Sequence, residues 1–265
     1  MRESKKEHWE RFWAQTREIS VDDVYDNGGR ILREIFAVAD PKGLRVLEVG
    51  AGSGRDSLAL AESGATVVTL DFAPQSLELI RDESKRRGQY VHVVGGNALQ
   101  MPFEDGSFDL VFHQGLLEHF RDPLPLLREN ARVLKPGGTL LVDVPQRFHY
   151  YTLGKHVLML FDRWFAGWET EFSVGELERR VCEVGLVPFH AYGDWMVPGL
   201  PYRALRKLLL ITFGHRLPMY PKVLPPFGTL AAKWRGWFRR QRVALYTTID
   251  IGVLGRKPRQ VDGPN

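Results

Sequence analysis

Residues 46–57 read Val-Leu-Glu-Val-Gly-Ala-Gly-Ser-Gly-Arg-Asp-Ser. The apolar start predicts a buried strand, the glycines predict a tight loop, and the residues that follow predict a helix. Glycines at 50, 52 and 54 let the backbone turn sharply and approach a ligand with no Cβ in the way. The next apolar run ends at Asp71, where a carboxylate can accept hydrogen bonds from ribose hydroxyls. This arrangement predicts a site for an adenosine-containing cofactor.

The glycine spacing indicates which cofactor. A dinucleotide loop reads G-x-G-x-x-G, and its third glycine would fall at Arg55. The chain instead has G-x-G-x-G, with Glu48 two residues before the first glycine. A carboxylate there suits a ligand with a cationic amino group and would repel a pyrophosphate. S-adenosyl-L-methionine carries an ammonium and a sulfonium and no phosphate, so this cofactor is expected.

Further segments have patterns that extend this interpretation. They are Leu70–Ser76, Gly96–Val111, Leu117–His119 and Arg132–Leu140. Together with the glycine loop they resemble the class I S-adenosylmethionine-dependent methyltransferases, in the branch that contains the ubiquinone and menaquinone biosynthesis methyltransferases. The resemblance runs from about Gly43 to Pro145 and thins outside that range.

The resemblance implies an α/β fold. The expected architecture is a Rossmann-like, seven-stranded, mostly parallel sheet with helices on both faces and the last strand antiparallel. The residues expected to bind the cofactor are Glu48, Gly50, Ala51, Gly52, Gly54, Asp71, Phe72, Asn97, Ala98 and His113. The family usually has aspartate at the position of Asn97. An amide oxygen can accept the same hydrogen bond from the adenine amino group, but without charge assistance.

Two histidines are the candidates for a general base. His113 follows the fourth predicted strand, and His149 follows the end of the fifth, where this family usually holds its substrate. If the acceptor is a hydroxyl, a base helps to remove its proton. Glu118, His119, Tyr150 and Tyr151 are the other reactive groups expected near that edge. The Glu118/His119 pair offers only two ligands, too few to predict a metal site.

Hydrophobic periodicity divides the chain into five parts. Residues 1–40 are predicted to form lid helices, at 3–19 and 26–39, before a cofactor-binding core over 41–194. Core strands are expected near 45–49, 66–70, 91–94, 108–113, 139–144 and 187–193, with a helix near 173–184. A basic, aromatic insert over 195–245 precedes a last strand within 246–257, and 258–265 is expected to be disordered.

The insert has an unusual charge. Residues 195–249 contain ten Lys or Arg and no Asp or Glu, which leaves 26 basic and 32 acidic residues for the rest of the chain. A helix drawn over 229–245 has Leu230, Trp234, Trp237, Phe238 and Leu245 on one face and basic residues on the other. This is the pattern of a helix lying on an anionic membrane. Packing of the insert on the protein's own core remains an alternative, and nucleic acid is disfavoured because no known module is present.

The composition favours the cytoplasm. The single cysteine, Cys182, rules out an intramolecular disulfide framework, and no apolar leader is visible at the N-terminus. The longest apolar runs, such as 208–211, are too short to cross a bilayer. The expected location is cytoplasmic, with peripheral attachment to the inner membrane face if the insert binds lipid.

These patterns predict a methyltransferase that uses S-adenosylmethionine. The acceptor is expected to be a small or lipid-linked molecule, methylated on oxygen, carbon or nitrogen. One alternative is a binding module that holds the adenosyl cofactor without turnover. The other is a nicotinamide-dependent oxidoreductase, which Arg55 and Glu48 disfavour.

Overall fold

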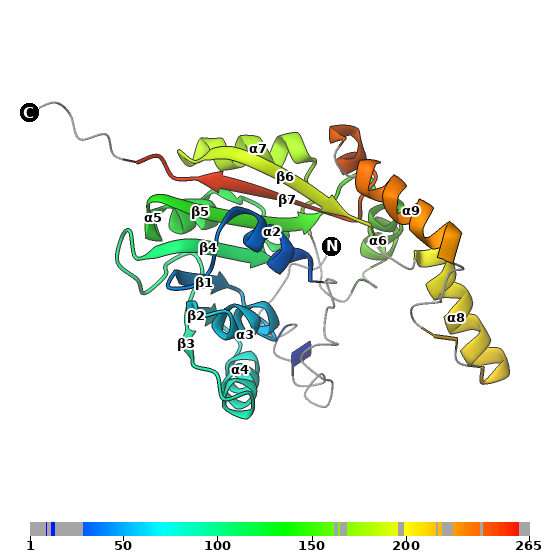
Figure 1. Ribbon diagram of the computed structural model, residues 1–265, viewed down its shortest axis with the longest axis horizontal. Coiled ribbons are helices and arrows are strands. Elements are labelled where there is room, and N and C mark those ends of the chain that lie inside the picture. The colour runs from blue at the N-terminus through cyan, green and yellow to red at the C-terminus, as the bar shows by residue number, and fades with distance from the viewer. Residues whose placement is uncertain are drawn as a thin grey trace, which may run out of the picture.

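The computed structural model describes residues 9, 12, 13, 29–161, 164, 169–195, 199–215, 217, 218, 225–238 and 241–259. Within these ranges lies one seven-stranded sheet, with the order β3-β2-β1-β4-β5-β7-β6 (Figure 1). The strands are β1 (Arg45–Val49), β2 (Thr66–Asp71), β3 (Val91–Gly95), β4 (Phe108–Gln114), β5 (Leu134–Pro145), β6 (Val187–Asp194) and β7 (Asp250–Arg256). β7 pairs antiparallel with both β5 and β6, and the remaining neighbours pair in parallel. The predicted fold class is confirmed.

Helices cover both faces of the sheet. They are α2 (Arg30–Val38), α3 (Arg55–Glu62), α4 (Pro74–Arg86), α5 (Leu124–Val133), α6 (Tyr150–Leu160), α7 (Val174–Glu183), α8 (Leu200–Phe213) and α9 (Pro225–Phe238), with short 3-10 turns η1 (Leu117–His119) and η2 (Arg242–Tyr246). Successive side chains of a strand point to opposite faces. Val46 therefore packs with α2, α3 and α4, while the adjacent Leu47 packs with α5 and α7. Each face thus has its own buried apolar core.

Several predicted boundaries differ from the structure. Helix α2 begins at Arg30, after Gly29 in a left-handed conformation (φ 68°), whereas the sequence predicted a start at residue 26. The helix predicted over 3–19 lies outside the described residues except at positions 9, 12 and 13. Likewise, of the tail 258–265 only residues 258 and 259 are described.

The helix predicted over 229–245 is wrong at its C-terminal end. Helix α9 stops at Phe238, and a separate 3-10 turn, η2, holds Leu245. Leu245 is buried in the core beside the sheet and is not on an amphipathic surface. The last strand, Asp250–Arg256, lies within the range 246–257 predicted for it. Ala244 and Leu245 are therefore buried in the core, and the exposed insert ends before them.

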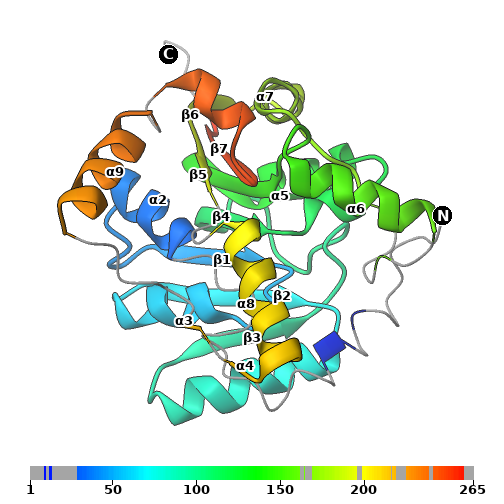
Figure 2. The ribbon, with the colours of Figure 1, turned by 90° about the vertical axis from the view of Figure 1, so that its right-hand side faces the viewer.

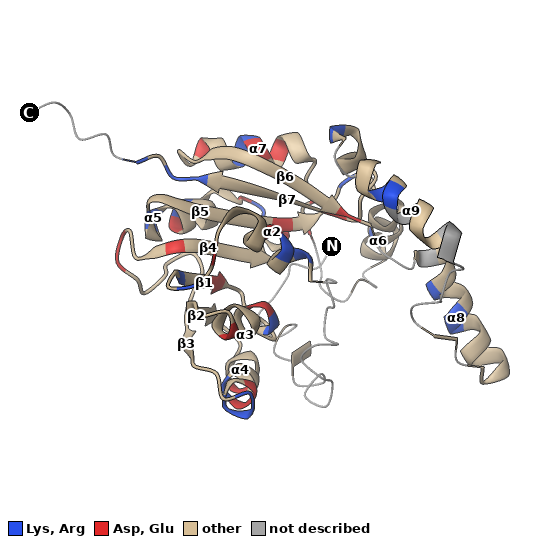
Figure 3. Ribbon diagram, in the orientation of Figure 1, with Lys and Arg blue, Asp and Glu red and all other residues tan. Residues whose placement is uncertain are grey.

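Helices α8 and α9 stand apart from the layered core. Both lie beyond the carboxyl ends of the parallel strands, at the side where α6 also projects (Figures 1 and 2). The charged residues that Figure 3 colours on these two helices are all basic. None of the helices in the described ranges is long and apolar enough to span a membrane. These helices border the edge of the sheet at which ligands bind in open α/β folds.

Candidate functional site

The loop between β1 and α3 is held in a conformation that requires glycine. Gly50, Gly52 and Gly54 all have positive φ angles, of 66°, 55° and 64°. A Cβ atom on Gly52 would lie 2.6 Å from Cζ2 of Trp13, so the indole ring packs directly on the loop backbone. Side chains other than glycine are strained in this region and would also displace the ring. The absence of a Cβ at Gly52 thus lets the Trp13 ring contact the loop backbone directly.

Asp71 fixes this loop to the neighbouring strand. Its Oδ2 accepts the backbone N–H of Gly52 at 2.9 Å, and its Oδ1 accepts that of Ala73 at 2.9 Å. Ser76 adds a bond from its hydroxyl to the carbonyl of Gly52 at 2.6 Å. Burial raises the pKa of Asp71, while these backbone donors oppose the rise. The carboxylate is therefore positioned at the carboxyl end of β2, as the sequence predicted.

Glu48 is a buried acid with one close partner. The Ser57 hydroxyl donates to its Oε2 at 2.5 Å. Burial, followed by the charge of nearby Asp56, raises the pKa of Glu48 to about 8. A carboxyl held in its neutral form at neutral pH regains its charge when a cation comes near. Glu48 is therefore suited to a cationic ligand.

These groups line one cavity of about 1030 Å³ at the carboxyl ends of the strands. Of the residues predicted to bind the cofactor, those on its wall are Glu48, Gly50, Ala51, Gly52, Asp71, Phe72, Asn97 and Ala98. Trp9 and Trp13 also line it. The glycine cradle, an acid at the end of β2 and a second acid that favours cations fit the ribose and the cationic methionine part of S-adenosylmethionine.

Asn97 lies on the cavity wall but already has a bond. Its Oδ1 accepts the backbone N–H of Leu99 at 3.0 Å, which forms a local turn. An oxygen has two lone pairs, so this contact does not prevent a second bond to an adenine amino group. The predicted role of Asn97 stays a prediction.

Three predicted residues are not among the described residues that line the cavity. Gly54 packs under the loop, where a Cβ would lie 2.8 Å from Ile80 Cγ1. His113 is fully buried within β4, and burial lowers its pKa to about 3. His149 caps the N-terminus of α6, because its Nδ1 accepts the backbone N–H of Tyr151 at 3.2 Å. This geometry does not favour either histidine as the base.

The far half of the cavity adds further residues to Glu118 and Tyr151, which the sequence analysis expected near this edge. Its charged side chains are Glu118, Asp143, Lys155, Glu169 and Asp250, and its aromatic ones include Tyr151 and Trp164. Trp164 Nε1 donates to Glu169 Oε1 at 2.7 Å. Glu118 was expected near this edge of the sheet as a reactive group, with no assigned role in binding an acceptor. Lys155 could have been noticed because it is the single Lys or Arg in helix α6.

Two buried cations pair with these acids. Lys155 lines the cavity, and Arg30 is not among the described residues that line it. Lys155 Nζ lies 2.6 Å from Glu169 Oε2 and 3.0 Å from Glu171 Oε1. Arg30 donates from Nε and Nη2 to both oxygens of Asp143, at 3.0 and 2.7 Å, and from Nη1 to Asp250 at 2.9 Å. Each cation therefore serves two carboxylates.

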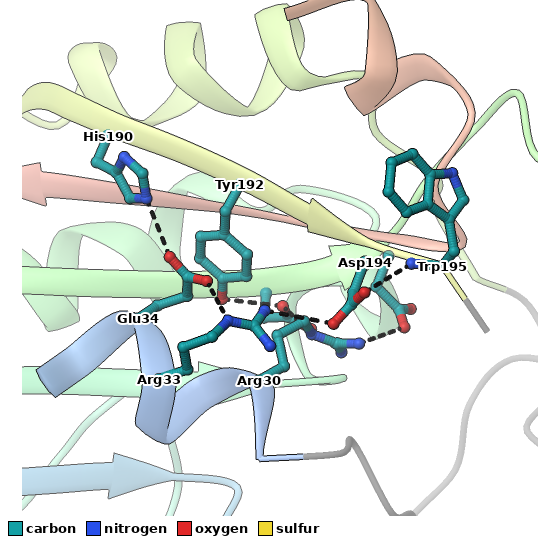
Figure 4. Close-up of polar contacts among 9 residues, drawn as sticks. Arg30, Arg33, Glu34, His190, Tyr192, Asp194 and Trp195 are labelled. Atoms are coloured by element: carbon teal, nitrogen blue, oxygen red, sulfur yellow. Dashed lines mark hydrogen bonds and ion pairs between the residues drawn. The ribbon is translucent and has the colours of Figure 1, made fainter. Parts of the chain in front are cut away.

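Arg30 belongs to a longer polar network between α2 and β6. Figure 4 shows Arg33 reaching Asp194 and Glu34 facing His190, at 3.3 and 3.0 Å. The hydroxyl of Tyr192 donates to Asp143 Oδ2 at 2.9 Å. This network pins α2 to the strands that carry the far wall of the cavity.

The described residues hold no cluster of three or more His, Cys, Asp or Glu suited to a metal ion. Burial raises the pKa of Glu118 well above its ordinary value and lowers that of His119 to about 4. His119 packs edge-on against Trp9, with ring centroids 5.0 Å apart. The pair contributes a neutral-leaning acid and a neutral imidazole to the cavity wall.

Comparison with known proteins gives one family. Residues 47–142 match the model described as a methyltransferase domain. A demethylmenaquinone methyltransferase from Anoxybacillus flavithermus is 30% identical over 194 residues, which cover 65% of this chain and 80% of that protein. The corresponding enzyme from Renibacterium salmoninarum is 41% identical over 108 residues, or 41% of this chain and 44% of that protein. The chain thus spans a little under half the length of the latter relative.

A solved structure extends the likeness beyond the matched core. A candidate methyltransferase from Haloferax volcanii, solved in complex with the Trm112 methyltransferase activator, superimposes with a TM-score of 0.64 at 19% sequence identity. The superposition covers 98% of this chain and 100% of that one. At this identity the likeness concerns the fold alone.

Proposed function

Because the chain belongs to the methyltransferase family, we propose that it transfers a methyl group from S-adenosylmethionine to a small-molecule or lipid-linked acceptor. The predicted family and enzyme class are confirmed. The observation that carries the proposal is the position of Asp71 and Glu48 around the glycine loop, on the wall of one cavity. When bound, S-adenosylmethionine supplies an electrophilic methyl group on a sulfonium.

The chain's residues would bind and orient this cofactor. Asp71 would accept from the ribose, and Glu48 would offset the charge of the methionine part. Asn97 would accept from the adenine amino group. Positioning an acceptor beside the methyl group can supply much of the rate enhancement, so the walls of the cavity matter as much as any base.

Calorimetric titration tests the cofactor directly. The protein should bind S-adenosylmethionine and its demethylated product, S-adenosylhomocysteine, and should not bind NAD. Binding of NAD with no binding of S-adenosylhomocysteine would contradict the proposal and favour an oxidoreductase. Methylation is then measured as release of S-adenosylhomocysteine in the presence of candidate acceptors.

Of the predicted lid, residues 1–40, we propose that the part with Trp9 and Trp13 closes over the site, because α2 packs in the core of the sheet. Trp9 and Trp13 line the cavity, and Trp13 packs on Gly52. An aromatic cover in this position would exclude water from the reacting groups. Deleting residues 2–20 should reduce methyl transfer far more than it lowers the melting temperature. Equal turnover by the shortened protein would exclude a lid.

The insert is proposed to dock on an anionic membrane surface. On α8 and α9, the side chains of Ile211, Phe213, Leu230 and Trp237 are each at least 60% exposed. The segment has basic residues and no acidic ones. Attraction of roughly 1 kcal/mol per basic residue near an anionic leaflet, together with buried aromatic area, would give reversible binding. Such docking would occur at the inner membrane face, and the cytoplasmic location itself stays a prediction.

Vesicle co-sedimentation tests this docking. The parent should bind phosphatidylglycerol-containing vesicles at low salt and ignore pure phosphatidylcholine, and binding should fall as salt is added. The double variant Lys233→Glu/Arg235→Glu on α9 should lose most binding. The matched control, Arg81→Glu/Lys85→Glu on α4, should keep it. No binding by the parent would leave self-packing of the insert as the better account.

A further inference from the structure

The part of the cavity away from the glycine loop is lined mainly by acidic residues. The half away from the glycine loop has the carboxyl groups of Glu118, Asp143, Glu169 and Asp250 on its wall, against the single cation Lys155. Such an excess would repel an anionic acceptor and attract a cationic one. The acidic lining is therefore informative about the acceptor, which the family alone does not identify.

The buried cations do not neutralise this excess. Arg30 is shared between Asp143 and Asp250, and Lys155 is shared between Glu169 and Glu171. In each group one Lys or Arg faces two carboxylates, of which Glu171 lies behind the cavity wall, and the neutral-leaning Glu118 is not part of this count. The cavity wall thus has a negative balance that its own ion pairs leave in place.

Glu118 is the acid best placed to meet a ligand. Only 3% of its surface is exposed, and its buried Oε2 has no hydrogen-bond partner within the described part of the chain. A buried carboxyl without a donor is costly, so a ligand N–H group would relieve it. Burial and then the charge of Glu169 raise the pKa of Glu118, so an ammonium group beside it would restore the ionised carboxylate, which is then a strong enough base to take a proton from that ammonium.

Aromatic rings complete the surroundings of this acid. Tyr151 and Trp164 stand edge to face with centroids 6.1 Å apart, and Trp164 is anchored to Glu169 through Nε1. Trp9 lines the same cavity. Aromatic faces attract ammonium groups as well as apolar ones. Carboxylates and aromatic rings together form the usual lining of a site for organic cations.

We infer that the acceptor is an amine, bound as an ammonium group against Glu118 between aromatic walls. This inference rests on the proposed methyl transfer and names its substrate class. Glu118 takes one proton from the ammonium, which frees the nitrogen lone pair to form the new N–CH₃ bond. The broken S–CH₃ bond leaves its electron pair on sulfur. The products are a methylated ammonium and S-adenosylhomocysteine, and the proton on Glu118 returns to solvent.

Three probes of matched size test the charge preference without needing turnover. They are benzylamine, which is cationic at neutral pH, benzyl alcohol, which is neutral, and benzoate, which is anionic. Each is titrated into the protein loaded with S-adenosylhomocysteine, and the loading step itself reports whether the proposed cofactor binds. Failure to load would therefore contradict the proposed function, separately from the choice of acceptor.

Benzylamine should bind at least about tenfold more tightly than benzyl alcohol, and benzoate should bind most weakly. Equal or tighter binding of benzyl alcohol or benzoate would overturn the inference, as would no binding of benzylamine. This comparison uses the parent protein alone, so it does not depend on whether any variant folds.

A variant then assigns the preference to Glu118. Glu118→Gln should weaken benzylamine about tenfold or more while changing benzyl alcohol less than about twofold, because only the ammonium loses a charge partner. Glu183→Gln, which removes an exposed carboxylate on α7, should change neither. Equal losses for both probes in Glu118→Gln would show a structural role and contradict the assignment.

Discussion

The sheet and the appended helices use the same kinds of apolar residue in opposite ways. In the sheet, Phe112 and Leu141 are completely buried. On α8, Ile211 and Phe213 are 71% and 77% exposed. Burial of apolar area stabilises a fold, so the first pair is explained by packing and the second is not. The difference separates residues that build the molecule from residues available to a partner.

The family match follows the same division. The matched domain ends at residue 142, before α6, α8 and α9 begin. The cofactor half of the cavity lies within the match, whereas Tyr151, Lys155 and Glu169 of the far half lie outside it. The residues proposed to bind the cofactor, and Glu118, thus lie within the matched domain, whereas the other groups proposed to surround the acceptor lie outside it.

The largest expected effect is on the buried ion pairs of the core. Arg30→Met would leave Asp143 and Asp250 without their cation, and breaking a buried pair costs about 3–5 kcal/mol. Urea denaturation should show this loss in the free energy of unfolding. The control Lys233→Met, on exposed α9, should change it little. Similar losses of the free energy of unfolding in both variants would contradict the distinction between the core and the appended helices.

Asp71 should have the next largest effect, and on binding. Asp71→Ala should weaken S-adenosylhomocysteine by about 1–3 kcal/mol, because a buried hydrogen-bond partner is lost. The variant also loses the bonds to Gly52 and Ala73, so its unfolding must be measured beside its binding. A variant that binds as well as the parent would remove Asp71 from the cofactor site.

Glu48 should impose a pH dependence on stability. Its pKa is raised from 4.5 to about 8 in the folded protein, so between these pH values the folded state holds a proton that the unfolded state lacks. The free energy of unfolding should therefore fall as pH rises through this window, by at most about 1.4 kcal/mol per pH unit. Glu48→Gln should lack this component. An unchanged profile in that variant would assign the slope to other groups.

The smallest expected effect is on the exposed face of α8. Phe213→Ala should change the free energy of unfolding by less than about 0.5 kcal/mol. The same change at Phe112 should cost about 3–5 kcal/mol, since it opens a cavity in the core. Denaturation of both variants under one condition gives the comparison. A large loss at Phe213 would mean that α8 is part of the fold's stabilising core.

Much of the core could be predicted because its signals are local. The alternation of apolar strands with helical segments and the glycine loop specified the sheet, and Asp71 was found from its place at the end of a strand. Of the acidic half of the cavity only Glu118 was expected, because Asp143, Glu169 and Asp250 come from distant segments. Only the folded sheet brings them together. No periodicity in the sequence reports such an assembly.

The histidines show the limit of placing residues by strand order alone. Both His113 and His149 occur near the correct edge of the sheet, but a position in sequence does not specify which way a side chain points. The side chain of His113 is completely buried, and the ring of His149 caps a helix. The boundary of α9 failed for a related reason, because Leu245 obeys the helical period yet is buried against the core.

The position of β7 has a consequence for synthesis of the chain. It is the last described strand to be made, yet it lies between β5 and β6 and supplies the pairing edge of each. During synthesis α8 and α9 are therefore made before β7, and the edges of β5 and β6 that pair with β7 are unpaired until then. Open edges of this kind invite intermolecular pairing, and long-range closure is slow. We expect folding of this protein to depend on chaperones, or on early binding of a partner to α8 and α9, until β7 has left the ribosome.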